Sequence, residues 1–141
     1  MKKLLLSGFL GIFLLHTSLF AEQAKGLNVV LTSADAQTQK MAMVLSLMTL
    51  KQGKKVNMVI CSKAGDLTVK GMKSQVLKPM NKSPKQLLKK IISKGANVKL
   101  CPLYLPNAEK KPEVLIEGVK EANPEKIANM LLDMDYKVLS Y

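Results

Sequence analysis

Short runs of β-branched and apolar residues alternate with helical patterns along this chain, and this alternation is the strongest constraint on its fold. Glycine, proline or polar clusters bound each run, as is typical of buried strands. Strands separated by helices pair side by side in parallel through crossover connections. We therefore predict an α/β fold, a three-layer sandwich around a mainly parallel sheet of about five strands. The predicted strands are 27–32, 55–61, 96–101, 118–121 and 137–141.

Capping signals place helices between these strands. Thr32-x-x-Asp35 has the pattern of a helix start, and Gly53 suits the position just beyond a helix end, so the first helix is predicted to end near Gln52. It is expected to lie largely buried against the sheet, with its methionines as core filler. Its apolar residues are Met41, Val44, Leu45 and Met48, widened by Ala42, Met43, Leu47 and Leu50.

The sequence also predicts the structure of the segments that connect the other strands. Ser83-Pro84-Lys85-Gln86 predicts a capped helix that ends at Gly95. A short helix is expected over 112–117, and a long loop over 63–79 with a turn of helix near Leu67. Asn123-Pro124 begins the last predicted helix, which carries Ile127, Met130, Leu131 and Met134 at helical spacing.

The N-terminus has the three parts of a secretory signal. Lys2 and Lys3 precede an apolar run over 4–15, and Ala21 offers a small residue for cleavage. The run is short for a membrane span, which needs about 20 apolar residues. We predict a signal peptide over 1–21, a single domain over 22–141, and a periplasmic or secreted protein without a stable membrane span after cleavage. The alternative is an uncleaved anchor, because Leu19, three residues before the cleavage point, is an imperfect cleavage residue.

Cleavage there would remove His16, the one histidine of the sequence. Removing 21 of the 141 residues leaves 120, enough for one domain with a real core. The composition of 22–141 excludes Ser-His-Asp and Cys-His catalysis and any histidine-based zinc site. No metal or cofactor is therefore expected.

All 22 basic residues are lysines. The segment 22–141 contains 20 of them and 10 acidic residues. The resulting charge of about +10 fits either an anionic partner or a solvated lysine-rich surface, and we favour the surface. Proteins that recognise nucleic-acid bases and phosphates use bidentate hydrogen bonds from the arginine guanidinium. Proteins that bind single-stranded nucleic acid stack the bases on aromatic side chains. With no arginine and no tryptophan, nucleic acid is not an expected partner.

Cys61 and Cys101 are the two cysteines, and each ends a predicted strand. Ligands of open parallel sheets bind beyond the carboxyl ends of the strands, so both thiols are candidate site residues there. Lys99 lies on the same strand face as Cys101, and a neighbouring cation would favour the thiolate form. The alternative is a structural disulfide between the two, which would contribute about 4 kcal/mol by closing a long loop.

Several segments together resemble the DsrE/DsrF-like sulfur-relay family over nearly all of 22–141. They are LNVVLT, KQGKKVNMVIC, LLKKIISKGANVKLCPLY, LIEGV and NPEKIANMLLDMDYKVLSY, with LLKKIISKGANVKLCP the most specific of them. The resemblance implies a small α/β fold that assembles into homotrimers or hexamers.

It also implies a role for Cys101, whose position matches the family cysteine that carries sulfur as a persulfide and passes it on. Many relatives have a second cysteine soon after, where this chain has Tyr104. The resemblance gives no role to Cys61, a possible second thiol. The implied partners are a sulfur donor or acceptor protein or a small sulfur species.

Three hypotheses follow. The first is persulfide binding or relay through Cys101, which makes the protein at most a sulfur-transfer protein with a cysteine nucleophile. Sulfane transfer needs no histidine base. Lysines on the loop after Cys61, namely Lys63, Lys70 and Lys73, would attract an anionic sulfur species or are simply solvated.

The second hypothesis is a non-catalytic oligomeric binding module with a structural Cys61–Cys101 disulfide. The third, a minor one, is Cu(I) handling by both cysteines with a methionine such as Met72 or Met80, since soft ligands suit Cu(I). No CxxC or MxxM cluster marks such a site in the sequence.

Overall fold

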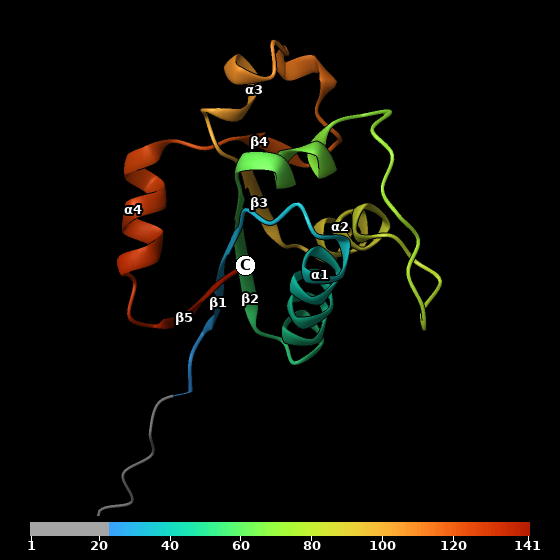
Figure 1. The fold of residues 1–141 in the computed structure, drawn as a ribbon. Coiled ribbons are helices and arrows are strands. Elements are labelled where there is room, and N and C mark those ends of the chain that lie inside the picture. Colours follow the sequence, from blue (N-terminus) through green and yellow to red (C-terminus); the bar gives the residue numbers. More distant parts are fainter. Residues whose placement is uncertain (1–22) are drawn as a thin grey trace, which may run out of the picture.

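The computed structural model describes residues 23–141, so the predicted signal segment and His16 lie outside the described residues. No helix within 23–141 combines the length and apolarity that crossing a bilayer requires. Strands and helices alternate as expected (Figure 1). In chain order they are β1 (Gly26–Leu31), α1 (Ala36–Lys51), β2 (Lys55–Ile60), the 3₁₀ helix η1 (Ser62–Thr68), α2 (Pro84–Ser93), β3 (Asn97–Leu100), α3 (Tyr104–Asn107), the 3₁₀ helix η2 (Pro112–Val114), β4 (Val119–Glu121), α4 (Pro124–Leu132) and β5 (Tyr136–Ser140).

The five strands form one sheet in the order β4-β3-β2-β1-β5, and every neighbouring pair is parallel. In Figure 1, α1 and α2 cover one face of this sheet while α4 lies on the other. The predicted α/β architecture with a parallel five-stranded sheet is therefore confirmed. Because all strands run the same way, the carboxyl ends of β2 and β3 meet at one edge.

The core lies between the sheet and the α1–α2 layer. Alternate residues of β1, β2 and β3 face these helices, as the two-residue period of a strand dictates. Burying this apolar surface is the main stabilising contribution to the fold. The core side chains of β1, β2 and β3 are Val29, Leu31, Val56, Met58, Ile60, Val98 and Leu100, and those of α1 and α2 are Ala42, Met43, Leu47, Leu87, Leu88 and Ile91.

The opposite face of the sheet is polar beneath α4. Asn28, Asn57 and Asn97 occupy paired positions on β1, β2 and β3. Their side chains form a ladder: Asn97 donates to Asn57 at 3.2 Å, and Asn57 donates to Asn28 at 2.9 Å. Asn28 is fully buried and donates in turn to the Met130 carbonyl of α4. Side-chain amides thus satisfy one another and attach α4 to the sheet.

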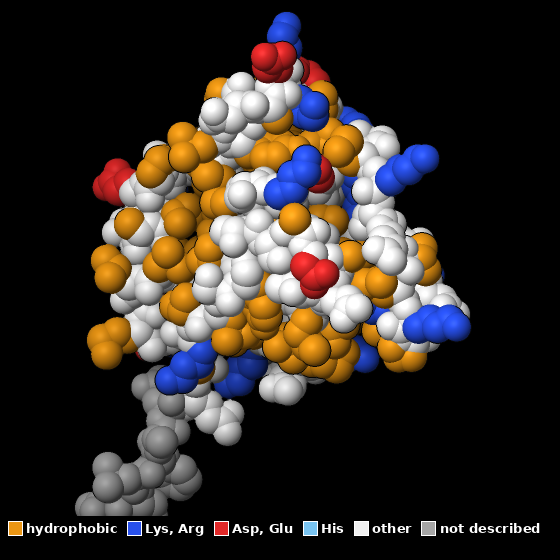
Figure 2. Space-filling view, viewed as in Figure 1, with side chains coloured by type: hydrophobic (Ala, Val, Ile, Leu, Met, Phe, Trp, Pro, Cys, Tyr) orange, Lys and Arg blue, Asp and Glu red, His pale blue; other side chains and the backbone are white. Residues whose placement is uncertain are grey.

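Helix α1 begins later than predicted and buries a different face. Asp35, not Thr32, caps it by accepting the Thr38 backbone N–H at 2.7 Å, while the Thr32 hydroxyl donates to the Tyr141 carbonyl at 2.8 Å. Ala42, Met43 and Leu47 are buried as predicted, but part of the predicted stripe is exposed, namely Met41, Leu45 and Met48. Figure 2 shows apolar side chains gathered over the α1 region and over the α4 side. Only part of the methionine stripe is therefore core filler.

The other helix predictions have mixed outcomes. The Ser83–Gln86 capping box of α2 is present in full. Asn123 caps α4, but this helix ends at Leu132, so Met134 lies beyond it and is 94% exposed. The helix expected over 112–117 is only the short turn η2, and α3 was not predicted. The turn expected near Leu67 is the 3₁₀ helix η1.

Two lysines hold the irregular segment between η1 and α2. The Lys40 ammonium, on a side chain only 7% exposed, donates to the carbonyls of Leu77 and Lys78. The Lys85 ammonium donates to the carbonyls of Val69 and Met72. The helices α1 and α2 thus fix this long connection at two points through charge-assisted hydrogen bonds.

Candidate functional site

The two cysteines directly follow the last paired residues of β2 and β3. Ile60 pairs with Leu100, so Cys61 and Cys101 take equivalent places on neighbouring strands. Their backbone N–H groups continue the ladder, that of Cys61 to the Leu31 carbonyl and that of Cys101 to the Ile60 carbonyl, each at 2.8 Å. Both thiols therefore lie at the carboxyl edge of the sheet, where the sequence predicted them.

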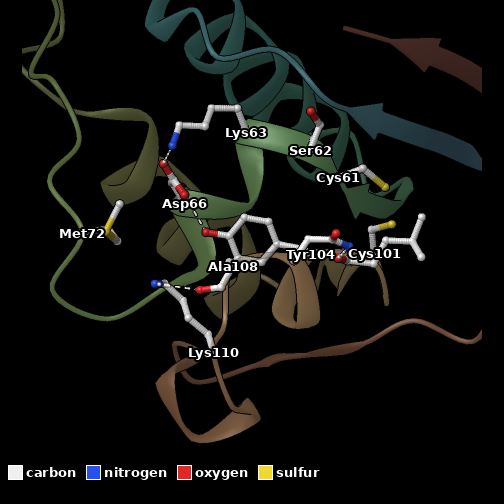
Figure 3. Close-up of a pocket in the computed structure, with 11 residues that line it drawn as sticks. Cys61, Ser62, Lys63, Asp66, Met72, Cys101, Tyr104, Ala108 and Lys110 are labelled. Atoms are coloured by element: carbon white, nitrogen blue, oxygen red, sulfur yellow. Dashed lines mark hydrogen bonds and ion pairs between the residues drawn. The ribbon is translucent and has the colours of Figure 1, made fainter.

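The structure brings these two thiols into contact. Figure 3 shows their two sulfur atoms side by side. Both cysteines are half-buried free thiols. Burial raises the pKa of Cys61 to about 12, and the hydrogen bond to Cys101 and the charge of a Cys101 thiolate add to that rise. Cys61 thus keeps its proton at neutral pH and is present in this pair as a thiol.

Local backbone geometry turns the chain sharply after each cysteine. Ser62 has a φ of +52°, in the left-handed region, and starts η1 directly after Cys61. Pro102 follows Cys101 and cannot donate to a strand ladder, so β3 ends there. The Cys101 carbonyl then accepts the Tyr104 N–H at 3.0 Å as the chain enters α3. These turns leave both thiols at the edge of the sheet rather than within it.

A hydrogen-bonded group joins the two segments that carry the thiols. The Tyr104 hydroxyl of α3 donates to Asp66 of η1 at 2.5 Å, and Lys63 forms an ion pair with Asp66 at 3.1 Å. Burial by itself would raise the pKa of Asp66, but these two bonds and the nearby Lys110 charge hold it below its usual value. Burial and the bond to Asp66 raise the pKa of Tyr104, so its hydroxyl remains a donor.

Gly65 allows this group to form. A Cβ atom placed on Gly65 would lie 2.2 Å from the Tyr104 ring, far inside van der Waals contact. The aromatic ring therefore packs directly on the η1 backbone. Only glycine permits this approach without moving the ring.

A cavity of about 790 Å³ opens beside the thiols (Figure 3). Its walls come from the start of η1, the segment before α2, and α3 with the turn that follows it. The thiols lie at one end of it and Met72 at the other. Its lining residues are Cys61, Ser62, Lys63, Asp66, Met72, Cys101, Leu103, Tyr104, Asn107, Ala108 and Lys110.

The lysines named from the sequence are not gathered at this cavity. Lys63 lines it, but its ammonium is paired with Asp66. Lys70 donates to the Glu113 carbonyl at 2.9 Å and lines a different pocket, while Lys73 is exposed and lines none of the described pockets. Lys99 faces the hollow beneath α4. Lys110, not singled out from the sequence, is the second lysine of the cavity wall.

The methionines proposed for Cu(I) are separated. Met72 lies across the cavity from the thiols, and Met80 lines another hollow beside Met41 and Val44. Among residues 23–141, no group of three or more His, Cys, Asp and Glu side chains is placed to hold a metal ion. The described site thus offers two soft ligands in contact, with no methionine beside them.

Sequence reasoning missed Asp66 and treated Tyr104 only as the residue that replaces a second cysteine. The spacing of Lys63 and Asp66 on one short helix is a weak signal for an ion pair. No local pattern predicts that Asp66 meets Tyr104, because 38 positions separate them along the chain. Their pairing depends on the neighbouring positions of β2 and β3 in the sheet.

Comparisons with known proteins bear on the fold. No protein-family model matches the sequence, and no curated protein matches it either. Among solved structures, the ychN protein from E. coli is similar with a TM-score of 0.65 and 20% identity, over 82% of this chain and 98% of that one. The protein of unknown function MTH1491 from Methanobacterium thermoautotrophicum is similar with a TM-score of 0.62 and 10% identity, over 82% and 97% of the two chains. With its five-stranded parallel sheet and these structural neighbours, the chain has a DsrE-like α/β fold.

Proposed function

We propose that this protein binds sulfur as a persulfide on Cys101 and passes it to another thiol. The observation that carries the proposal is the position of Cys101, half-buried at the carboxyl edge of the sheet with a cavity of about 790 Å³ in front of it. The DsrE-like fold and the family resemblance of the Cys101 segment support it further.

The chemistry requires little machinery. The Cys101 thiolate attacks the outer sulfur of a donor persulfide, the donor S–S bond breaks, and the donor leaves as a thiolate while Cys101 becomes a persulfide. Cys61 stays protonated beside it, because burial raises its pKa to about 12. No histidine is needed as a base, in keeping with a segment 22–141 that contains none.

The cavity suits a reactive sulfur species. Leu103, Met72 and the Tyr104 ring give it apolar walls. Lys63 is paired with Asp66, so Lys110 provides the net positive charge of the wall, and a persulfide is an anion near neutral pH. Leu103 is 69% exposed, so it offers an apolar contact for a docking protein at the edge of the cavity.

Intact-mass spectrometry tests the proposal. The reduced protein is incubated without oxygen with glutathione persulfide and desalted, and its mass is compared with those of the Cys61→Ser and Cys101→Ser variants. We expect an increase of about 32 Da, one sulfur atom, in the wild type or in Cys61→Ser, and none in Cys101→Ser. An unchanged mass in Cys61→Ser, with Cys101 shown to be alkylatable, contradicts the proposal.

One observation favours a second candidate function. The contact between the thiols of Cys61 and Cys101 would also suit a structural disulfide in a non-catalytic binding module. Peptide mapping without reductant separates the two functions. A stoichiometric disulfide that resists mild reductant supports the binding module, whereas free or easily reduced thiols support sulfur transfer.

Location and assembly are part of the proposal. We propose export to the periplasm or beyond, based on the sequence of 1–21, which cell fractionation tests. We also propose a homotrimer or hexamer. The exposed apolar residues of the α4–β5 side support assembly, since Leu132 and Val138 are 78% and 48% exposed. Light scattering would contradict assembly if it gave the mass of a monomer at micromolar concentration.

A further inference from the structure

The contact between the two thiols has a consequence for the fate of bound sulfur. We infer that Cys61 discharges the Cys101 persulfide: it attacks the inner sulfur of Cys101, forms the Cys61–Cys101 disulfide and releases the outer sulfur as hydrosulfide. This inference rests on the proposed persulfide on Cys101 and names the reaction that removes it. A passive carrier would need only one thiol.

The geometry selects which sulfur Cys61 can attack. Cys61 and Cys101 directly follow paired residues of adjacent strands, and their sulfur atoms lie side by side (Figure 3). The Cys61 thiol therefore lies next to the inner sulfur of the persulfide, which is the Sγ atom of Cys101. The outer sulfur of a persulfide must point away from this contact, toward the cavity that both thiols line. An acceptor protein approaching through the cavity meets the outer sulfur, so transfer and discharge use opposite sides of Cys101.

The step balances without an added oxidant. The Cys61 thiol and the Cys101 persulfide anion react to give the intramolecular disulfide and hydrosulfide, HS⁻. One S–S bond forms between the two cysteines, and the S–S bond to the outer sulfur breaks. The two cysteine thiols are oxidised overall, the outer sulfur is reduced to sulfide, and the Cys61 proton goes to the leaving sulfur. A further round requires a thiol reductant, such as a dithiol protein, to reopen the disulfide.

The same contact explains why discharge would compete with transfer rather than always precede it. Burial and the neighbouring Cys101 keep the Cys61 thiol protonated, and a protonated thiol is a poor nucleophile. Proximity acts in the opposite direction, because a thiol already in contact has a very high effective concentration. The persulfide would thus persist until an acceptor arrives or Cys61 reacts.

The test follows the sulfur after loading. Reduced wild-type protein and Cys61→Ser are charged with glutathione persulfide without oxygen, desalted at once, and sampled for intact mass and for free sulfide. In the wild type we expect the extra sulfur to be lost, with one sulfide released per protein and a Cys61–Cys101 disulfide peptide in its place. In Cys61→Ser we expect the adduct to last at least about tenfold longer.

Each other outcome overturns a specific claim. If Cys61→Ser takes up no sulfur, the proposed function fails and the inference fails with it. If Cys61→Ser takes up sulfur but the wild type holds its adduct equally long, only the inference fails. Sulfide release without the disulfide peptide also overturns it. If Cys61→Ser does not fold, Cys61→Ala replaces it. The wild type alone also tests the inference, because one Cys61–Cys101 disulfide should form for each sulfide released.

Discussion

Replacing Tyr104 by phenylalanine isolates the bond that joins the two thiol-bearing segments. The hydroxyl donates to Asp66 at 2.5 Å, while the ring packs on Gly65. Phenylalanine keeps that packing and removes only the donor. Because α3 follows Cys101 and η1 follows Cys61, the lost bond releases both segments at once.

The magnitude follows from the surroundings of Asp66. A hydrogen bond to a charged group contributes about 1.5–3 kcal/mol to stability. The Asp66 side chain is 24% exposed and keeps its ion pair with Lys63, so water and Lys63 offset part of the loss. We expect the free energy of unfolding to fall by about 1–2 kcal/mol, which lowers the urea midpoint by about 0.5–1 M.

The effect depends on pH with a definite sign. Burial opposes ionisation of Asp66, but the Tyr104 bond and the Lys63 charge keep its folded-state pKa below the usual value. Its stabilising contribution is present above the unfolded pKa of about 3.9 and is lost as the pH falls through the folded value. The difference between Tyr104→Phe and wild type should therefore shrink below about pH 4.

Urea unfolding of wild type and Tyr104→Phe, at neutral and acidic pH, measures this difference. Tyr136→Phe is the matched control, since the Tyr136 hydroxyl makes no hydrogen bond within residues 23–141, and its effect should stay within about 0.5 kcal/mol. An effect of Tyr104→Phe no larger than that of the control, or one equal at both pH values, refutes the account of this bond.

Three further substitutions or measurements test other parts of the structure. Gly65→Ala should cost about 1–3 kcal/mol in thermal unfolding, because its methyl group would lie 2.2 Å from the Tyr104 ring; a neutral effect would contradict that packing. Iodoacetamide at about pH 8 should modify Cys101 before Cys61 in peptide mapping, since burial and Cys101 raise the pKa of Cys61 to about 12, and the reverse order would contradict the assignment of the nucleophile. Asn28→Ala should cost about 1–3 kcal/mol, because it removes the partner of two hydrogen bonds under α4, and faster amide exchange in α4 should accompany it.

The sheet could be predicted from the sequence because its signals are local. Runs of β-branched residues between glycines and polar clusters placed all five strands, and capping residues placed α2 and the start of α4. The placement of Cys61 and Cys101 at one edge follows from the parallel direction alone. Their direct contact depends on β2 and β3 being neighbours in register, which neither strand encodes by itself.

The errors arise where tertiary contacts decide the local structure. Thr32 could cap a helix, but its hydroxyl bonds the Tyr141 carbonyl, so Asp35 caps α1 instead. The α1 stripe was predicted as one buried face, yet Met41 is 52% exposed, since the helix packs through Met43 and Leu47. Helix α3 has four residues and no apolar periodicity of its own, so nothing in its sequence marks it.

Whether Cys101 carries sulfur can be measured on protein taken from the cells that make it. The protein is alkylated at once on lysis, without added reductant, and the peptide containing Cys101 is analysed by mass spectrometry. We expect a fraction of Cys101 to carry one extra sulfur atom, with the remainder free or in a readily reduced disulfide to Cys61. A complete disulfide that resists mild reductant, with no extra sulfur on Cys101, would contradict it.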